Sequence, residues 1–250
     1  MITADLTGKT ALVTGASSGF GAHFTRVLAA AGATVIAAAR REDKLTALTR
    51  DVEAAGGRAA PLVLDVSDHR AIQAAFENLG AVDIVVNNAG VSGASPALDV
   101  PPDEWDWVYG VNTRGVWFVA QAAAQRMVAS KKSGSIINIA SITGLRPAAG
   151  NTAYASSKAA VIQMTRNLAL DWARYGIRVN ALAPGYFKTD INDAFLESDY
   201  GKALVKRVPQ RRTGDYEELS GPLLLLASDA SSYMTGSVIA VDGGHLCSAL

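Results

Sequence analysis

Tyr154 and Lys158 are spaced so that a phenol and an ammonium group can act on one proton. Four positions separate them within a predicted helix, which puts both side chains on one face. The ammonium favours the phenolate, lowers the tyrosine pKa from about 10 and makes Tyr154 a usable general acid or base. Ser141 could donate a hydrogen bond to a carbonyl oxygen, and Asn112 could hold a water that connects Lys158 to solvent. Without further context, an exposed helix pair without function is the alternative.

A glycine-rich loop, TGASSGFG at 14–21, lies between the first predicted strand and the first predicted helix. Gly15 permits a tight turn, Gly19 lets the backbone approach a pyrophosphate, and Gly21 allows the helix to pack closely on the sheet. The helix N-terminus offers free N–H groups and a positive dipole end to phosphates. The spacing is GxxxGxG instead of GxGxxG, but the strand–loop–helix context predicts dinucleotide binding.

Two further loops follow predicted strands. Asp65 and Val66 end the third strand, and NNAG at 87–90 ends the fourth. Ligands of open α/β sheets bind at the carboxyl ends of the strands, where Asp65 could accept a hydrogen bond from an adenine amino group. The alternative is that Asp65 and Asn88 satisfy backbone groups of their own loops.

The elements that position these residues alternate along the chain. Strands are predicted at 9–14, 34–39, 59–64, 82–87, 135–140, 177–183 and 237–241. Helices are predicted at 19–31, 42–55, 68–78, 103–129, 153–175 and 216–227, with Ser67 as the N-cap of the third. Continuous apolar runs are typical of parallel strands buried on both faces. The pattern predicts an α/β fold, one Rossmann-like domain over residues 1–250 with a doubly wound, seven-stranded parallel sheet and helices on both faces.

The segment 188–215 has no clear periodicity, and such a segment in a compact domain is often a lid or substrate loop. Arg146, Lys188, Arg211 and Arg212 could recognise an anionic substrate. A charged, solvated rim is the preferred interpretation of these four side chains.

Composition disfavours several classes of function. The 250 residues include 23 Lys plus Arg and 23 Asp plus Glu, whereas a nucleic-acid binder normally carries a basic excess. No apolar run approaches the ~20 residues of a membrane-spanning helix, so no membrane partner is expected. His23, His69 and His245 are far apart in the sequence, so no metal is expected. Cys247 is the single cysteine, which fits a cytoplasmic protein without intramolecular disulfides.

The motifs above belong to a longer series along the chain. It comprises TGASSGFG at 14–21, Asp65, NNAG at 87–90, Asn112, Ser141, YASSK at 154–158, PG at 184–185 followed by Thr189, and VDGG at 241–244. In this order and spacing the chain resembles, over essentially its whole length, the short-chain dehydrogenase/reductase family. The pattern looks like its gluconate 5-dehydrogenase-type and 3-oxoacyl-carrier-protein reductase-type members. Phe20 departs from the family, which more often has an aliphatic residue there.

The resemblance implies a role for each matching residue. Tyr154 would donate or accept the proton, Lys158 would bond the nicotinamide ribose, Ser141 would polarise the substrate carbonyl, and Asn112 would complete a proton relay. The residues implied to bind the cofactor are Gly15, Ser17, Ser18, Gly19, Phe20, Gly21, Arg40, Asp65, Val66, Asn88, Ala89, Gly90, Tyr154, Lys158, Pro184, Gly185, Phe187 and Thr189. The family also implies a homotetramer, with the helices from Asp103 and Ala153 and the C-terminal segment at its interfaces.

The end of the second predicted strand favours NADP over NAD. By alignment with the family's pattern, Ala39 stands where NAD-binding members have an acidic residue for the ribose hydroxyls, and Arg40 and Arg41 follow it. An arginine can hold a 2′-phosphate through two parallel charge-assisted bonds, and Ser17 could add a hydroxyl. NADP(H) is therefore the expected cofactor, with NAD(H) acceptable. A solvated helix start is the alternative for the two arginines.

Together these features predict an NADP-dependent oxidoreductase that transfers a hydride between nicotinamide and a carbonyl or secondary alcohol of a small molecule. The alternative is a catalytically inactive nucleotide-binding scaffold or regulatory protein. A broken Ser–Tyr–Lys set would mark such a protein, and all three residues are present.

Overall fold

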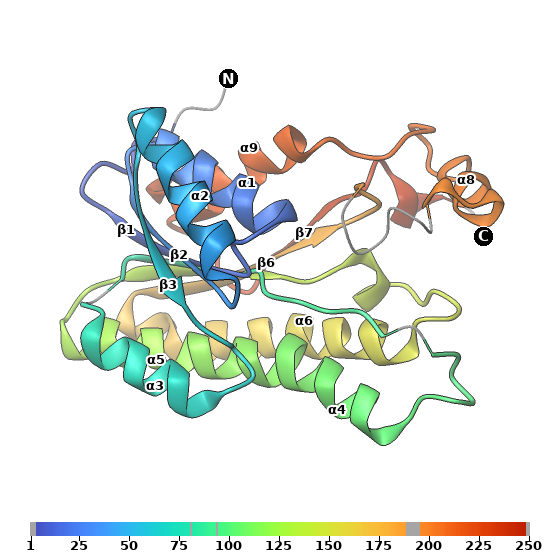
Figure 1. The fold of residues 1–250 in the computed structure, drawn as a ribbon, viewed down its shortest axis with the longest axis horizontal. Helices are drawn as coiled ribbons and strands as arrows, with labels where there is room; N and C mark the ends of the chain where they lie inside the picture. The colour runs from blue at the N-terminus through green and yellow to red at the C-terminus, as the bar shows by residue number, and fades with distance from the viewer. Residues whose placement is uncertain (1–3, 81, 94, 189–195, 249–250) are drawn as a thin grey trace.

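The computed structural model describes residues 4–80, 82–93, 95–188 and 196–248. Within these residues, seven parallel strands form one sheet in the order β3-β2-β1-β4-β5-β6-β7 (Figure 1). The strands are β1 (Thr10–Thr14), β2 (Thr34–Ala39), β3 (Arg58–Val63), β4 (Ile84–Asn87), β5 (Gly134–Ile139), β6 (Ile177–Pro184) and β7 (Val238–Val241). The helices are α1 (Gly19–Ala30), α2 (Glu42–Ala54), α3 (His69–Asn78), α4 (Pro102–Tyr109), α5 (Val116–Ala129), α6 (Thr152–Trp172), α8 (Asp199–Val205) and α9 (Ser220–Ala227). No helix in the described ranges is long and apolar enough to cross a membrane.

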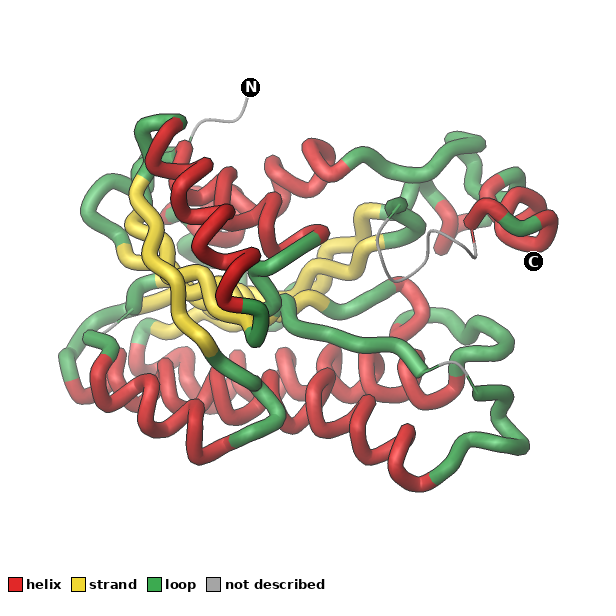
Figure 2. Tube along the Cα trace, viewed as in Figure 1, coloured by secondary structure: helices red, strands yellow, loops and turns green. Residues whose placement is uncertain are grey.

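Each face of the sheet has its own hydrophobic core, because successive strand residues point to opposite faces. In β1, Ala11 and Val13 join the core with α1, α2 and α9, whereas Leu12 joins the core with α3, α5 and α6. All three side chains are fully buried. Figures 1 and 2 show these two layers of helices on opposite sides of the sheet. The predicted doubly wound, seven-stranded α/β fold is confirmed.

The two edge strands differ from the prediction that every strand is buried on both faces. Most residues of β3 are exposed, and Val63 at its end is 55% exposed. The residues of β7 are half-buried or exposed. Each of these strands has a neighbour on one side only, so it is covered less completely than the central strands.

The helix predicted over 103–129 is interrupted. α4 ends at Tyr109, residues Gly110–Gly115 form a π-helical turn, and α5 begins at Val116. π-Helical turns are rare overall, but those that occur are often found at functional sites. This one carries Asn112, so the interruption falls at a predicted site residue.

Asp68, and not Ser67 as predicted, is the N-cap of α3. Its carboxylate accepts hydrogen bonds from the backbone N–H groups of Arg70 at 2.9 Å and Ala71 at 3.2 Å. Ser67 instead donates its hydroxyl to Asp65 at 2.7 Å. Asp68 directly precedes the first helical residue, the position from which a side chain reaches the unpaired N–H groups.

The segment 188–215 contains regular structure that its sequence pattern did not indicate. Within it, Ser198 accepts a hydrogen bond from the Gly201 N–H at 3.1 Å and caps the short helix α8. Further on, the Gly214 N–H donates to the Tyr186 carbonyl at 2.9 Å, so the end of the segment is fixed to the residues after β6. Thr189 lies outside the described residues.

Candidate active site

A cavity of about 300 Å³ opens at the carboxyl ends of the central strands. The strand order reverses between β1 and β4, and ligands of open α/β sheets bind at such a point. The predicted site residues that line the cavity are Gly15, Ser17, Ser18, Gly19, Phe20, Arg40, Asp65, Val66, Asn88, Ala89, Gly90, Ser141, Tyr154, Lys158, Pro184, Gly185 and Phe187. Gly21 and Asn112 are buried and do not line it.

The glycine loop leaves space for a ligand close to its backbone. Gly15 has φ +66°, and a Cβ there would lie 2.8 Å from the Ala89 Cα. A Cβ at Gly21 would overlap the Gly15 carbonyl oxygen, so Gly21 lets α1 pack against the loop. At Gly19, in contrast, only the Tyr216 hydroxyl lies within 4 Å of a Cβ, at 3.9 Å. These residues therefore fit a pyrophosphate, which must approach the backbone where α1 begins.

Asp65 and Asn88 satisfy groups of the loops around them, as the alternative interpretation held. The Asn88 side chain donates to the carbonyl oxygens of Thr14 at 2.9 Å and Gly15 at 3.3 Å. Asp65 accepts hydrogen bonds from both the N–H and the hydroxyl of Ser67. Because both also line the cavity, they fix the shape of its wall at the ends of β3 and β4.

Arg41, the second of the two arginines that follow Ala39, contacts the glycine loop. Its guanidinium donates to the Ser17 hydroxyl at 2.9 and 3.1 Å and to the Ser18 hydroxyl at 2.9 Å. Arg40 also lines the cavity, with its guanidinium 4.0 Å from the Asp65 carboxylate. Arg41 thus brings a positive charge to a glycine loop that has no basic residue of its own. The pair of adjacent arginines was the sequence signal, but it did not indicate which one faces the loop.

Ser141, Tyr154 and Lys158 converge where β5 ends and α6 begins. The Lys158 ammonium donates to the Ile139 carbonyl at 2.8 Å and lies 5.6 Å from the centre of the Tyr154 ring. The Ser141 hydroxyl oxygen accepts from the Thr143 N–H at 3.2 Å and from the Thr143 hydroxyl at 3.0 Å. Thr143 thus occupies the acceptor side of Ser141, and the Ser141 hydroxyl is left to donate to the Tyr154 phenol or to a ligand beside it.

The pKa values of this pair differ from the sequence prediction. Burial raises the pKa of Tyr154 above its ordinary value, the hydrogen bond with Ser141 lowers it, and Tyr186 raises it further. Burial also lowers the pKa of Lys158 to about 8. The prediction that Lys158 lowers the tyrosine pKa is wrong for this structure. A buried lysine favours its neutral form, so it offers less charge to a phenolate that burial already disfavours.

The Asn112 side chain forms its hydrogen bonds with other residues of the protein. It accepts a hydrogen bond from the Val91 N–H at 2.8 Å, and its amide donates to the Val91 carbonyl at 2.9 Å and the Ser157 hydroxyl at 3.0 Å. The side chain is fully buried. It joins the loop after β4 to α6, next to Lys158, so it positions these two elements relative to each other.

Phe20 joins the glycine loop to segments far away in the sequence. Its ring centre lies 5.3 Å from that of Phe187 and 5.2 Å from that of Tyr216, both in edge-on geometry. The Tyr216 hydroxyl donates to the Lys188 carbonyl at 2.8 Å. The aromatic residue that departs from the family pattern therefore fills the contact between the glycine loop and the chain after β6.

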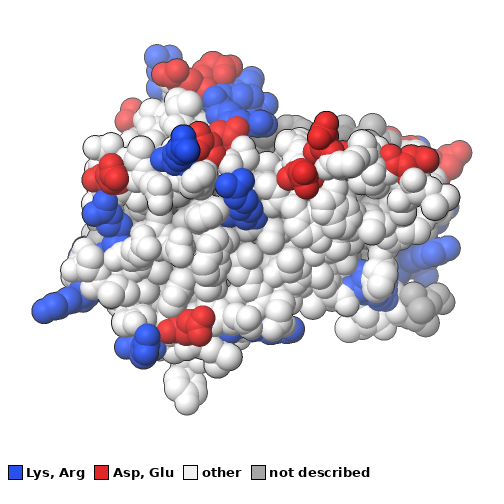
Figure 3. Space-filling view, turned by 90° about the horizontal axis from the view of Figure 1, so that it is seen from below, with Lys and Arg blue, Asp and Glu red and all other residues white. Residues whose placement is uncertain are grey.

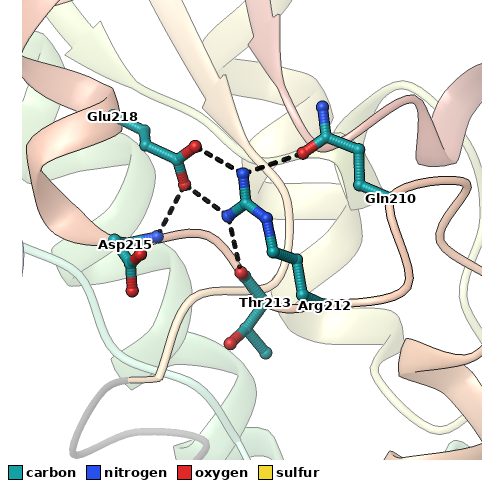
Figure 4. Close-up of polar contacts among 5 residues, drawn as sticks. All are labelled: Gln210, Arg212, Thr213, Asp215 and Glu218. Carbon is teal, nitrogen blue, oxygen red and sulfur yellow. Dashed lines mark hydrogen bonds and ion pairs between the residues drawn. The ribbon is translucent and has the colours of Figure 1, made fainter.

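Arg212 is held by a carboxylate at the end of the segment 188–215 (Figure 4). Its guanidinium donates to both oxygens of Glu218, at 2.6 and 2.7 Å, and also to the Gln210 side chain and the Thr213 carbonyl. The bond from Arg212 lowers the pKa of Glu218 to about 2, and a bond from the Asp215 N–H contributes. Arg212 thus closes a turn.

The other three candidate anion-binding cations differ in their surroundings. Lys188 forms an ion pair with Glu197 at 2.9 Å. Arg211 is exposed and has φ +57°. Arg146 is half-buried and donates to the Ser248 carbonyl at 3.1 Å. Of these side chains, Arg146 is the one that burial and the C-terminal segment hold in place.

Known proteins resemble this chain along almost all of its length. A family model described as enoyl-(acyl carrier protein) reductase matches residues 15–245. The chain is 40% identical over 243 residues to a 3-oxoacyl-(acyl-carrier-protein) reductase of Thermotoga maritima, which covers 96% of this chain and 98% of that protein. It is 40% identical over 246 residues to 3beta-hydroxysteroid dehydrogenase 1 of Eggerthella lenta, at 96% and 94% coverage. A crystal structure of a gluconate 5-dehydrogenase from Burkholderia cenocepacia, in complex with NADP and tartrate, matches with TM-score 0.94 at 40% identity and covers 98% of both chains.

Proposed function

Because the chain belongs to the short-chain dehydrogenase/reductase family, we propose that it is an NADP-dependent oxidoreductase acting on a carbonyl or secondary alcohol of a small molecule. The observation that carries this proposal is the convergence of Ser141, Tyr154 and Lys158 on the cavity that also contains the glycine loop. A nicotinamide cofactor supplies or accepts the hydride when it is bound. The intact set of three residues disfavours an inactive scaffold.

Tyr154, Ser141 and Lys158 have separate roles in the remaining chemistry. In reduction, Tyr154 donates its phenolic proton to the carbonyl oxygen, and its raised pKa keeps that proton in place at neutral pH. Ser141 donates a hydrogen bond to the same oxygen, because Thr143 already occupies its acceptor side. In oxidation, Tyr154 accepts the alcohol proton as its own phenolic proton passes to neutral Lys158.

Arg41 and Arg40 support the preference for NADP. Both line the cavity after β2, and Arg41 lies on the serines of the glycine loop. Ala39, at the end of β2, offers no carboxylate that would bind ribose hydroxyls or repel a 2′-phosphate. The similar gluconate 5-dehydrogenase was crystallised with NADP. NAD(H) remains an acceptable cofactor, because the glycine loop does not depend on the extra phosphate.

Steady-state kinetics with both cofactors test this proposal. A charge-assisted bond to the phosphate should make kcat/KM about ten- to a hundredfold higher with NADPH than with NADH. Arg41→Ala and Arg40→Ala should each weaken NADPH and leave NADH nearly unchanged, with Arg41→Ala the larger effect. Ala39→Asp should reverse the preference, and Arg50→Ala on the exposed side of α2 is the control. A preference for NADH, or indifference to both arginines, would refute NADP specificity.

We also propose that the enzyme is a cytoplasmic homotetramer with α4 to α6 at an interface. The exposed fractions of Trp105 and Trp107 on α4 are 38% and 45%, and that of Leu170 on α6 is 81%. Figure 3 views this layer of helices from outside and shows a broad area of uncharged side chains between scattered charged ones. Large exposed apolar areas commonly mark interaction surfaces.

A further inference from the structure

Three polar side chains from the connections that follow β5, β6 and β7 lie close to one another. Tyr186 lies between the cavity-lining residues Gly185 and Phe187, and its phenol is close enough to raise the pKa of Tyr154. The His245 ring meets the Tyr186 ring edge-on, with the ring centres 5.4 Å apart. Arg146 is the third member, and it influences both Tyr186 and His245 electrostatically. We call these three residues the Arg146 cluster.

His245 has hydrogen-bonding capacity that the protein does not use. Only 8% of the residue is exposed, and its buried Nδ1 has no hydrogen-bond partner within the part of the chain that the structure describes. Burial and the cations Arg146 and Arg207 lower the pKa of His245, while Asp242 raises it. A neutral imidazole offers one N–H donor and one acceptor. An unpaired buried polar atom calls for a physical explanation, and a ligand group is one.

Arg146 also keeps donors for a ligand. Nη1 donates to the Ser248 carbonyl, and Ser248 in turn donates its hydroxyl to the His245 carbonyl at 2.8 Å. The C-terminal segment thereby holds the guanidinium against the turn that carries His245. Among the described residues this is the only hydrogen bond of the Arg146 side chain, so most of the five N–H donors of its guanidinium remain.

The charges around the cluster favour an anion. Arg146 and Arg207 are the cations close to His245, and Asp242 is the nearby carboxylate. Both Asp242 oxygens are occupied, because one accepts from the Gly244 N–H at 2.9 Å and the other from the Leu246 N–H at 2.8 Å. Asp242 is thus engaged by its own turn, and the guanidinium of Arg146 remains available to a ligand.

We propose that the Arg146 cluster binds the carboxylate of the substrate, and that the enzyme therefore acts on small hydroxy or oxo carboxylic acids. This inference rests on the proposed function. Arg146 supplies the charge, while Tyr186 and His245 supply neutral donors, so a carboxylate can replace its water with fixed hydrogen bonds. Tyr186 is the member of the cluster that lies close to Tyr154, between the cavity-lining Gly185 and Phe187, so an acid held by the cluster would present another of its carbons to the catalytic phenol.

Calorimetric titration with L-tartrate, a small hydroxy acid, tests the subsite directly. The protein is titrated with and without saturating NADP⁺ at constant ionic strength set by sodium chloride. Wild type should bind tartrate saturably, and Arg146→Gln should bind it about ten- to a hundredfold more weakly. Arg146→Lys should restore part of the affinity. Arg174→Gln, on the exposed 3₁₀ turn after α6, is the matched control and should bind like wild type.

Turnover with a matched pair of substrates gives a second readout. With NADP⁺, D-gluconate should have at least tenfold higher kcat/KM than D-glucitol, which has a hydroxymethyl group in place of the carboxylate. Arg146→Gln should remove this difference through the KM for gluconate. The inference is overturned if wild type does not bind tartrate, if Arg146→Gln binds it equally well, or if glucitol is used as readily as gluconate. Failure of the proposed function would instead appear as no NADPH oxidation with any ketone in a broad panel, whatever the tartrate result.

Discussion

At the residue scale, Tyr154 and Lys158 are two neighbouring groups whose pKa values burial shifts in opposite directions. The pKa of the tyrosine rises above its ordinary value, and that of the lysine falls to about 8. The lysine ammonium is therefore the first of the two to lose its proton as pH rises. Once neutral, its amine can accept the phenolic proton, which makes Lys158 the group that prepares Tyr154 for alcohol oxidation.

Tyr154→Phe should retain NADP binding and lose about 10²–10⁴-fold in kcat, because the change deletes only the transferable proton. Turnover is followed by nicotinamide absorbance, and cofactor affinity is followed by fluorescence titration. Tyr175→Phe removes an exposed phenol from the turn after α6 and serves as the control. Near wild-type turnover in Tyr154→Phe would show that another group moves the proton.

The pH dependence of alcohol oxidation should separate the two groups. In wild type the rate should rise with an apparent pKa near 8, the value to which burial brings Lys158. In Lys158→Met this rising limb should move above about pH 10, because the remaining group is a tyrosine with a raised pKa. Lys132→Met, an exposed change, should leave the profile unaltered. A limb that stays near 8 in Lys158→Met would assign it to a third group.

Which residues would meet could be predicted from the sequence, but the shifts of their pKa values could not. The order and spacing of Ser141, Tyr154 and Lys158 indicated that they would meet, and they do. The sign of the Tyr154 pKa shift depends on burial, which no spacing reveals. The contact of Arg41 with the glycine loop could not be predicted for a similar reason, since it depends on the path of the chain after β2.

At the element scale, the 3₁₀ turn Ile142–Gly144 determines how closely Ser141 approaches α6. A Cβ at Gly144 would lie 2.7 Å from the Lys158 carbonyl carbon and 2.8 Å from the Ala159 nitrogen. Those are backbone atoms of a helix, which cannot move aside as a flexible side chain does. The glycine therefore lets the end of β5 and the start of α6 bring the catalytic side chains together.

Gly144→Ala should push the turn away from α6. We expect a loss of stability of about 1–3 kcal/mol from overpacking and a fall in kcat that exceeds any change in cofactor affinity. Thermal unfolding and steady-state kinetics measure the two effects. Gly80→Ala is the control, because a Cβ there meets no atom within 4 Å. Wild-type kcat in Gly144→Ala would mean that the approach of turn and helix does not govern catalysis.

Long periodic elements such as α1, β2 and α6 followed directly from the apolar pattern. The π-helical turn Gly110–Gly115 did not, because its residues continue a helical spacing and only the hydrogen-bond ladder changes. α8 has seven residues, too short for its pattern to be distinguished from a loop. Short or irregular elements depend on tertiary contacts, such as the bond of Gly214 to Tyr186, that local sequence does not report.

At the scale of the whole molecule, Leu170→Arg tests the proposed tetramer. The substitution would bury an unpaired charge from each copy of α6 in an apolar interface, which costs free energy. The mass measured by light scattering should therefore fall below that of a tetramer. Val63→Arg places the same charge on the exposed edge strand β3 and should leave the assembly intact. A monomeric wild type would refute the tetramer, and a tetrameric Leu170→Arg would place its interface elsewhere.

The distribution of contacts among the strand connections has a consequence for evolutionary change. The end of the cavity beside the glycine loop is built by the loops after β1, β2, β3 and β4, whereas the Arg146 cluster comes from the connections after β5, β6 and β7. Arg146, Tyr186 and His245 lie outside the paired strands, so mutations there can change the recognised substrate without disturbing the sheet or the glycine loop. Relatives named for an acyl-carrier substrate, a steroid and gluconate are each 40% identical to this chain, so this degree of overall identity does not determine the substrate.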